Sequence, residues 1–397
     1  MKPLQPSSRA SEVRYAIRDI VVYADKLKKE KDIKILPLNI GDPCQFDFSP
    51  PVHMIEAVHK AMLDNHNGYS PAYGIPEALE ALRREAHKKG LKDVKDIFIT
   101  TGASEAVELS ITALLNPGDN ILIPYPQYPL YTAVVKKIGA SYKPYYLNEE
   151  DNWQPDIDNI VSQIDESTKA IVVINPNNPT GNVYTRETLL RIIELAKQYN
   201  LLIISDEIYD KMIFEDMPFY SMASLDGDVP VITFGGIAKN YVVPGWRIGW
   251  AYLTGSLEII KNYKETLGKL LRARLCANHP MQYCIGPALE SPGVHISGIL
   301  AKLKKRKEIT CQWIDRIPHL SLVAPEAAFY AFPRINMAID DTEFAKRLLE
   351  QTGVLVVPGS GFGQKPDSAH FRIVFLPQDE LLEKAYEKIE EFIKNNY

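Results

Sequence analysis

Residues 169–209 read KAIVVINPNNPTGNVYTRETLLRIIELAKQYNLLIISDEIY, and this stretch decides the fold. Two short runs of Val, Ile and Leu, at 171–174 and 201–204, flank the segment 186–199, whose apolar residues recur at helical spacing. Nearly continuous apolar strands joined by a helix are typical of a parallel sheet that is covered on both faces. The stretch therefore predicts a strand, a crossover helix and a second parallel strand.

The same alternation extends over most of the chain. Towards the N-terminus, DIFITT (96–101) and ILIPYP (121–126) have strand character, and PLYTAVVKKIG (129–139) has helix character. We therefore expect an α/β fold, a mostly parallel sheet with helices on both faces. Beyond residue 317, short strands alternate with helices as in a smaller α+β unit. We expect a large domain at 50–290 and a small domain made of 291–397 together with 1–49, part of which covers the site.

The composition of the chain limits the classes of binding partner and the cellular location that we expect. The chain has 397 residues and a formal charge of −5, from 45 Lys and Arg against 50 Asp and Glu, without a long run of one sign. Nucleic acid is therefore not an expected partner, because phosphate binding needs a basic stripe. No run of about 18 apolar residues predicts a membrane span, and the start lacks a signal-peptide pattern. The scattered cysteines have no metal-ligand spacing and favour a reducing cytoplasm: Cys44, Cys276, Cys284 and Cys311.

Three polar motifs follow predicted strands directly. GAS follows DIFITT, NPNNPTG follows KAIVVI, and DEIY follows LLIIS. In open α/β sheets, ligands bind outside the carboxyl ends of the parallel strands. We therefore expect these three motifs to meet at one ligand site.

A fourth motif, FGGIAKNYVVPGWRIGWAY at 234–252, contains Lys239 and, eight positions later, Arg247. A lysine between apolar segments loses hydration, so its pKa falls and its amine becomes a nucleophile towards an aldehyde. An arginine fork binds two phosphate oxygens at once. An aldehyde with a phosphate suggests pyridoxal phosphate. For an isolated pair, a surface-loop lysine and a salt-bridged arginine are the more frequent explanation.

Chemistry on such a cofactor needs further groups. Asp206, at the end of LLIIS, is a candidate partner for the pyridine nitrogen, although a single Asp at this place often caps a turn. Tyr209 and Asn178 are candidate hydrogen-bond donors to the ring's phenolate oxygen; Asn178 is equally compatible with a turn. Tyr128 either stacks on the ring or packs in the core.

Two further candidates are a phosphate-binding turn and a carboxylate-binding arginine. Gly102, Ala103 and Ser104 connect a strand to a helix start, which is either a phosphate cradle or an ordinary N-cap. Arg372, in the apolar strand HFRIVF, is expected to face a carboxylate of the protein or of a substrate, because arginine is rarely buried alone. No metal site is predicted.

The order and spacing of NPNNPTG, SDEIYD and AKNYVVPGWRIG resemble the class I aminotransferases of the fold-type I pyridoxal phosphate group, over nearly the whole chain. The resemblance implies the following roles. Lys239 would form the Schiff base and Asp206 would pair with the pyridine nitrogen. Asn178 and Tyr209 would bind the phenolate oxygen, and Tyr128 would stack on the ring. The phosphate would be held by Gly102, Ala103, Ser104 and Arg247, and the substrate α-carboxylate would be bound by Arg372.

Within this family, YAIRDIVVYADKL, LNIGDP, GASEAVE, PQYPLY and RLCANHPMQ are similar to the alanine aminotransferase branch. The likeness implies that Tyr69 reaches the phosphate of a neighbouring subunit, hence a homodimer with shared active sites, and that Gly41 lets the N-terminal segment close over substrate. Tyr15 and Arg18 in that segment are candidate substrate contacts, or simply part of an amphipathic helix. Ala238 and Gly236 stand where relatives have Ser, so one phosphate hydroxyl is absent or comes from Ser104.

The expected activity is transfer of the amino group of L-alanine, or of a similar small amino acid, to 2-oxoglutarate in a ping-pong reaction. The alternatives on the same fold are aspartate, aromatic or branched-chain donors, or β-elimination as in a C–S lyase. A ligand-sensing regulator would carry an added DNA-binding domain, for which the chain has no room. A nicotinamide-dependent dehydrogenase needs a strand followed by G-x-G-x-x-G and a helix, and this pattern is absent.

Overall fold

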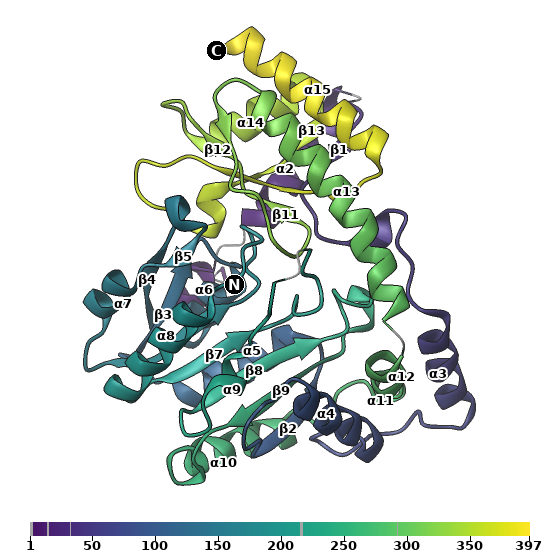
Figure 1. Cartoon of the computed structure of the whole chain (residues 1–397), viewed down its shortest axis with the longest axis vertical. Coiled ribbons are helices and arrows are strands. Elements are labelled where there is room, and N and C mark those ends of the chain that lie inside the picture. The colour runs from purple at the N-terminus through teal and green to yellow at the C-terminus, as the bar shows by residue number, and fades with distance from the viewer. Residues whose placement is uncertain (1–2, 14–15, 32, 215–216, 292) are drawn as a thin grey trace.

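A computed structural model describes residues 3–13, 16–31, 33–214, 217–291 and 293–397 (Figure 1). Its main feature is a sheet with the strand order β2-β9-β8-β7-β6-β3-β4-β5. The strands are β2 (Asp96–Thr100), β3 (Asn120–Tyr125), β4 (Ser141–Asn148), β5 (Gln154–Pro155), β6 (Thr168–Ile174), β7 (Leu202–Asp206), β8 (Val231–Gly236) and β9 (Gly249–Thr254). The predicted α/β class is confirmed, and 169–209 forms the predicted parallel pair, β6 and β7.

Two strands depart from the parallel arrangement. β9 is antiparallel to both β8 and β2, and β5 is antiparallel to β4. β8 and β9 are joined by residues 237–248, which start at the carboxyl end of β8. Because β2, β6, β7 and β8 run in one direction, this connection lies at the same edge of the sheet as the segments that follow β2, β6 and β7.

Helices cover both faces of the sheet because side chains of successive strand residues point to opposite sides. On β6, Ile171 and Val173 belong to one buried cluster, whereas Val172 and Ile174 belong to another. The first cluster is completed by α4 (Pro76–Lys88), α7 (Ile157–Gln163), α8 (Arg186–Tyr199) and α12 (Ile285–Glu290). The second is completed by α5 (Ala103–Leu114), α6 (Leu130–Ile138) and α10 (Leu257–Ala273).

The C-terminal part forms a smaller α+β unit, drawn above the large sheet in Figure 1. A three-stranded sheet there has the order β11-β15-β14, and β1 pairs in parallel with β13. Its elements are β1 (Leu36–Pro37), α13 (Val294–Arg316), β10 (Leu320–Ser321), β11 (Tyr330–Ala331), β12 (Arg334–Ile335), α14 (Asp341–Thr352), β13 (Val354–Leu355), β14 (Val357–Pro358), η4 (Gly359–Phe362), β15 (Phe371–Val374) and α15 (Asp379–Asn396).

We propose that residues 50–290 are the large domain and that 1–49 with 291–397 are the small domain. In support, a third hydrophobic cluster combines Leu36, Leu38 and Phe48 with buried side chains from 299–393. Tyr209 and Val242 from the large part also pack in this cluster, so the two domains would be in apolar contact.

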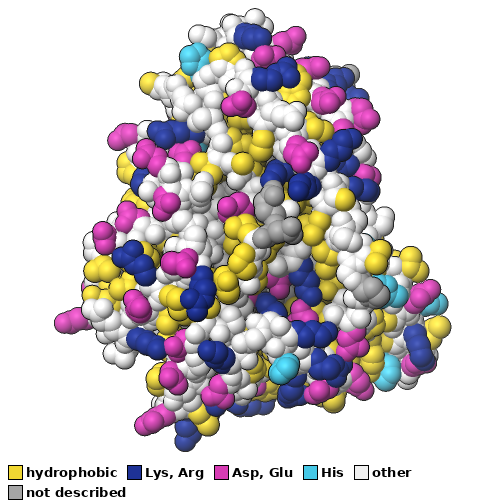
Figure 2. Space-filling model, in the orientation of Figure 1, with side chains coloured by type: hydrophobic (Ala, Val, Ile, Leu, Met, Phe, Trp, Pro, Cys, Tyr) yellow, Lys and Arg dark blue, Asp and Glu magenta, His cyan; other side chains and the backbone are white. Residues whose placement is uncertain are grey.

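The remaining elements are short or peripheral. They are α1 (Ser8–Ser11), α2 (Ala16–Lys31), η1 (Pro43–Gln45), α3 (Val52–Leu63), η2 (Glu149–Asp151), α9 (Met222–Leu225), η3 (Pro244–Trp246) and α11 (His279–Gln282). Tyr15 lies outside the described residues, as does the side chain of Arg18. On the face drawn in Figure 2, side chains of both charges are interspersed. None of the helices in the described ranges combines the length and apolar character of a membrane span.

Candidate active site

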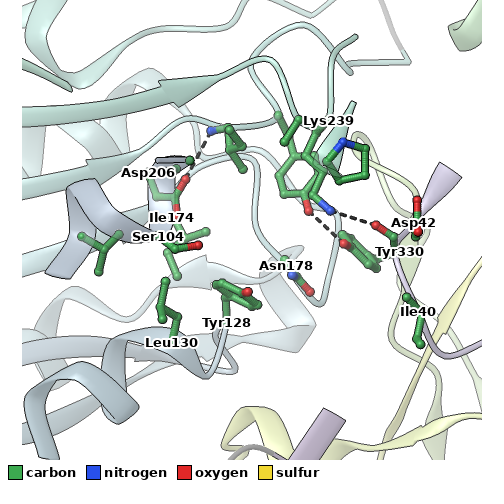
Figure 3. A pocket seen from close by; sticks show the side chains of 18 of the residues that line it. Ile40, Asp42, Ser104, Tyr128, Leu130, Ile174, Asn178, Asp206, Lys239 and Tyr330 are labelled. Atoms are coloured by element: carbon green, nitrogen blue, oxygen red, sulfur yellow. Dashed lines mark hydrogen bonds between the residues drawn. The ribbon is translucent and has the colours of Figure 1, made fainter. Parts of the chain in front are cut away.

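A cavity of about 480 Å³ opens at the carboxyl edge of the large sheet, between this sheet and the small part (Figure 3). The four sequence motifs meet there, together with the N-terminal segment and β15. The sequence-predicted residues that line the cavity are Gly41, Gly102, Ala103, Ser104, Tyr128, Asn178, Asp206, Tyr209, Lys239, Arg247 and Arg372. Tyr69 is the described candidate that does not line it.

Lys239 projects into the cavity from the segment that joins β8 to β9. Its Nζ donates a hydrogen bond to the backbone oxygen of Gly41 over 2.8 Å and lies 5.6 Å from the centre of the Phe329 ring. Burial, reinforced by the positive charge of Arg372, lowers the pKa of Lys239 to about 8, whereas Asp42 opposes the shift. About a tenth of the amine is therefore uncharged, and nucleophilic, at pH 7.

At one end of the cavity, the turn after β2 opens α5 beside Arg247. Gly102, the N-cap residue of α5, has φ +75°, and a Cβ there would lie 2.5 Å from Nη2 of Arg247. The same Nη2 lies 3.5 Å from Oγ of Ser104. A guanidinium, a hydroxyl and the first N–H groups of a helix thus lie close together, and glycine leaves the room that the guanidinium occupies. This arrangement fits a phosphate group.

Gly236 and Ala238, where the family resemblance leads us to expect Ser, have different surroundings. A Cβ on Gly236 would lie 3.0 Å from Cδ1 of Ile208 and 3.1 Å from the backbone oxygen of Ile248, so the backbone leaves little room for a side chain. Ala238 lines the cavity. The hydroxyl that the structure does place beside Arg247 is that of Ser104.

Asp206 ends β7 and is buried, with its carboxylate directed into the cavity (Figure 3). Its Oδ2 accepts a hydrogen bond from Oη of Tyr131 over 2.8 Å, and its Oδ1 accepts one from the backbone N–H of Ile208 over 3.2 Å. Burial raises the pKa of the carboxyl to about 6, although both hydrogen bonds oppose this shift. A cationic ring nitrogen would offset the desolvation of this carboxylate.

Replacing Asp206 by Asn is expected to raise the melting temperature of the cofactor-free protein at pH 8, but not at pH 5. Because the folded-state pKa is raised to about 6, the ionised carboxylate destabilises the fold above pH 6. The ionised carboxylate lowers the free energy of unfolding by an amount on the order of 3 kcal/mol. This loss disappears as the pH falls through 6 towards 4, because the folded state binds the proton at a higher pH than the unfolded state does. Thermal melts at both pH values measure the effect.

The exposed Glu56 offers a control, since Glu56→Gln removes a carboxylate from the surface. It should change the melting temperature little at either pH. An Asp206→Asn protein that is less stable than wild type at pH 8 would contradict the assigned burial cost.

Arg372 is buried in β15 and lies against the ring of Tyr330, which Figure 3 shows on the opposite side of the cavity from Ser104. Its Nη1 donates to Oδ1 of Asn178 over 3.1 Å, and its Nη2 donates to the backbone oxygen of Asn39 over 2.5 Å. The guanidinium lies between the rings of Tyr330 and Phe362, with Cζ 4.7 Å from each ring centre. This environment holds the cation in one orientation at the cavity wall.

Two tyrosines that contact cavity residues were not identified from the sequence. Tyr131 follows Tyr128 by three positions on an apolar helix, and its hydroxyl binds Asp206. Tyr330 lies on β11, and its hydroxyl oxygen is 2.8 Å from that of Tyr209 (Figure 3). The available signal was that a tyrosine in an apolar segment needs a partner for its hydroxyl. Nothing local to either segment indicated which partner.

Tyr69 lies on the loop between α3 and α4 and is 83% exposed. The same loop is held by His279, whose Nδ1 lies 2.9 Å from the backbone oxygen of Gly68. A tyrosine ring so exposed on an ordered loop is free to reach a second molecule.

The chain matches proteins of known class. Residues 33–389 match the family described as aminotransferase class I and II. The glutamate-pyruvate aminotransferase AlaA of Escherichia coli strain K12 is 39% identical over 402 residues, covering 99% of this chain and 98% of that protein. The alanine aminotransferase of Mycobacterium tuberculosis strain H37Rv is 38% identical over 397 residues, covering 98% and 92%. The structure of an alanine aminotransferase from Pyrococcus furiosus gives a TM-score of 0.95 at 43% identity, covering 99% and 100%.

The fold and the cavity, with these likenesses, define an enzyme that depends on pyridoxal phosphate. The chain belongs to the class I and II aminotransferase family. Its substrates are therefore amino acids and 2-oxo acids. The predicted family, cofactor and enzyme class are confirmed.

Proposed function

We propose that this aminotransferase moves the amino group of L-alanine, or of a similar small amino acid, to 2-oxoglutarate in a ping-pong reaction. The observation that carries this proposal is that Lys239, Asp206, Arg247 and Arg372 line a single cavity. The cavity thus combines the amine with a phosphate cradle, a buried carboxylate and a buried guanidinium. Full-length similarity to proteins named as alanine or glutamate-pyruvate aminotransferases supports the choice of alanine.

When bound, pyridoxal phosphate supplies an aldehyde that takes up the amino group and a ring that accepts electrons from the substrate Cα. Gly102, Ala103, Ser104 and Arg247 would hold its phosphate. The Asp206 carboxylate would keep a proton on the ring nitrogen, and Tyr131 would orient that carboxylate.

Three side chains would complete the binding of the ring. Asn178 and Tyr209 would donate hydrogen bonds to the ring's oxygen, and Tyr128 would lie against the ring face. Asn178 also accepts a hydrogen bond from Arg372, so it would link the ring to the substrate carboxylate.

Two groups would act directly on the substrate. Arg372 would bind the α-carboxylate with its planar fork, which fits two carboxylate oxygens. The Lys239 amine would take a proton from the substrate Cα and deliver it to the carbon that receives the amino group. Gly41 would allow the N-terminal segment to approach, and its backbone oxygen holds the Lys239 amine. Tyr15 and Arg18 are proposed as contacts from the segment that covers the substrate.

A panel of amino donors with 2-oxoglutarate tests the proposed specificity. We expect L-alanine to give a higher kcat/KM than L-aspartate, L-tyrosine or L-leucine by at least about tenfold. Glutamate should form with the matching 2-oxo acid. Faster transfer from one of the other donors would reject alanine as the preferred donor while leaving aminotransfer intact. Release of ammonia and a thiol from a cysteine conjugate would instead favour a β-eliminating lyase.

We also propose a homodimer in which Tyr69 of one subunit reaches the phosphate site of the other. Support comes from the exposure of Tyr69 on an ordered loop, away from the cavity of its own chain. The expected result is complementation: a mixed dimer of a Lys239→Ala chain and a Tyr69→Ala chain regains about half of the wild-type activity.

Such a mixed dimer contains one site with both Lys239 and Tyr69 and one site with neither. Co-expression with two different affinity tags isolates it, and chromatography on a sizing column checks the mass. The two parent homodimers are the controls, measured at limiting cofactor. A mixed dimer that is no more active than the average of its parents would contradict shared sites.

We infer that the enzyme works in the cytoplasm. All four cysteines are free thiols, as expected in a reducing compartment. Cell fractionation with activity measurement in each fraction tests this assignment.

A further inference from the structure

Tyr330 is a buried cavity residue whose position is set by the small sheet. It lies on β11, which pairs antiparallel with β15, and Tyr330 is directly opposite Val374. Arg372 is two residues from Val374 on β15, so it lies on the same face of the sheet as Tyr330. Strand register therefore places the phenol beside the guanidinium.

The ring of Tyr330 forms one wall of the Arg372 site. Cζ of Arg372 lies 4.7 Å from the centre of the Tyr330 ring, and the ring of Phe362 lies at the same distance. A guanidinium that is shielded from water is strongly attracted to the face of an aromatic ring. The two rings hold the plane of the guanidinium, and the hydrogen bonds from Nη1 to Asn178 and from Nη2 to Asn39 hold its direction within that plane.

The hydroxyl of Tyr330 makes a different contact. Its oxygen lies 2.8 Å from that of Tyr209, with the two rings nearly perpendicular at 89°. Tyr209 has a single hydroxyl proton. If that proton goes to an acceptor in the cavity, the hydrogen bond between the phenols must use the proton of Tyr330. The cation of Arg372 on its ring makes Tyr330 a good donor.

Both phenols stay protonated under working conditions. Burial raises the pKa of Tyr209 well above its usual value. Burial also raises the pKa of Tyr330, while the charge of Arg372 opposes this. Two protons are thus available for two donated hydrogen bonds in a row.

We propose that Tyr330 is a positioning residue that joins the two halves of the site: its hydroxyl donates to Tyr209, which donates into the cavity, and its ring holds Arg372. This inference rests on the proposed function. The donated hydrogen bond strengthens Tyr209 as a donor, because hydrogen bonds in a chain polarise one another. A Tyr209 that donates more strongly to the ring oxygen stabilises that oxygen's negative charge. The alternative is that Tyr330 only fills space, in which case its hydroxyl is dispensable.

Tyr330→Phe separates these possibilities, because it removes the hydroxyl and keeps the ring on Arg372. The readout is the absorbance of the bound cofactor as a function of pH, without substrate. We expect the midpoint of this titration to rise by roughly 0.5 to 1 pH unit, the equivalent of one hydrogen bond. The KM for the amino donor should change less than about threefold, because the guanidinium keeps both aromatic neighbours.

Phe362→Leu is the matched control for the ring contact. It removes the other aromatic face from Arg372, so we expect the KM for the amino donor to rise by about tenfold or more. The absorbance midpoint should stay within about 0.2 pH unit of wild type, an energy far below that of one hydrogen bond. Tyr386→Phe controls for loss of a buried hydroxyl, because Tyr386 binds Thr310 in the small part. It should shift neither quantity.

An unshifted midpoint in a folded Tyr330→Phe protein overturns the proposal, and so does a lower midpoint, since that would make Tyr209 the donor to Tyr330. In both cases a wild-type enzyme with normal spectrum and turnover leaves the proposed function intact. A wild-type protein that takes up no pyridoxal phosphate would overturn the proposed function and this inference together.

Discussion

Lys239→Ala should reduce turnover by roughly 10⁴-fold or more while the protein still binds pyridoxal phosphate. The variant lacks the amine that moves the substrate proton, but it keeps the phosphate cradle at Gly102, Ser104 and Arg247 and the carboxylate of Asp206. Equilibrium dialysis measures cofactor binding, and a coupled assay with 2-oxoglutarate measures turnover. Turnover within about tenfold of wild type would contradict the role of Lys239 as proton carrier.

Added methylamine serves as the control for an intact cavity. A small free amine fits where the lysine side chain was removed and should restore part of the turnover in proportion to its uncharged form. Lys60→Ala changes an exposed lysine on α3 and should leave turnover unaltered. Loss of activity without any amine response would indicate a collapsed site.

The lowered pKa of Lys239 leads to a related expectation for cofactor uptake. Its pKa is about 8, and only the uncharged amine attacks an aldehyde. The rate at which cofactor-free protein acquires the absorbance of bound pyridoxal phosphate should therefore rise with pH through a midpoint near 8.

The second large effect is expected at Arg372. Arg372→Lys keeps a positive charge near Lys239 but loses the planar fork, so the KM for the amino donor should rise on the order of 10²-fold. The affinity for pyridoxal phosphate should remain nearly unchanged, because Arg372 contacts Asn178 and Tyr330 and not the phosphate cradle beside Arg247. Steady-state kinetics and a cofactor titration of the same preparation measure the two effects.

Arg247→Lys is the matched control at the other end. It removes a fork beside Gly102 and Ser104, so the cofactor affinity should fall while the KM for the amino donor, measured at saturating cofactor, stays nearly constant. An Arg372→Lys enzyme that loses cofactor instead of substrate affinity would reverse the assigned ends of the site.

The elements of the fold were predictable because their patterns are local. The alternation around 169–209 predicted β6, α8 and β7, and each has the expected type. The antiparallel direction of β9 was not predicted, since a buried apolar run looks alike in either direction. That direction matters, because it turns residues 237–248 back at the edge where the other motifs end.

The sequence by itself determined which chemistry was available: a lysine between apolar segments, an acid at the end of a strand and glycines at a helix start are recognisable from their immediate neighbours. Only the tertiary structure decided which side chains tune them. Tyr131 and Asp206 are 75 positions apart, and Tyr209 and Tyr330 are 121 positions apart. The sequence indicates that a hydroxyl in an apolar segment needs a hydrogen-bond partner. Strand order and register determine which residue that partner is, because they bring distant segments within hydrogen-bonding distance.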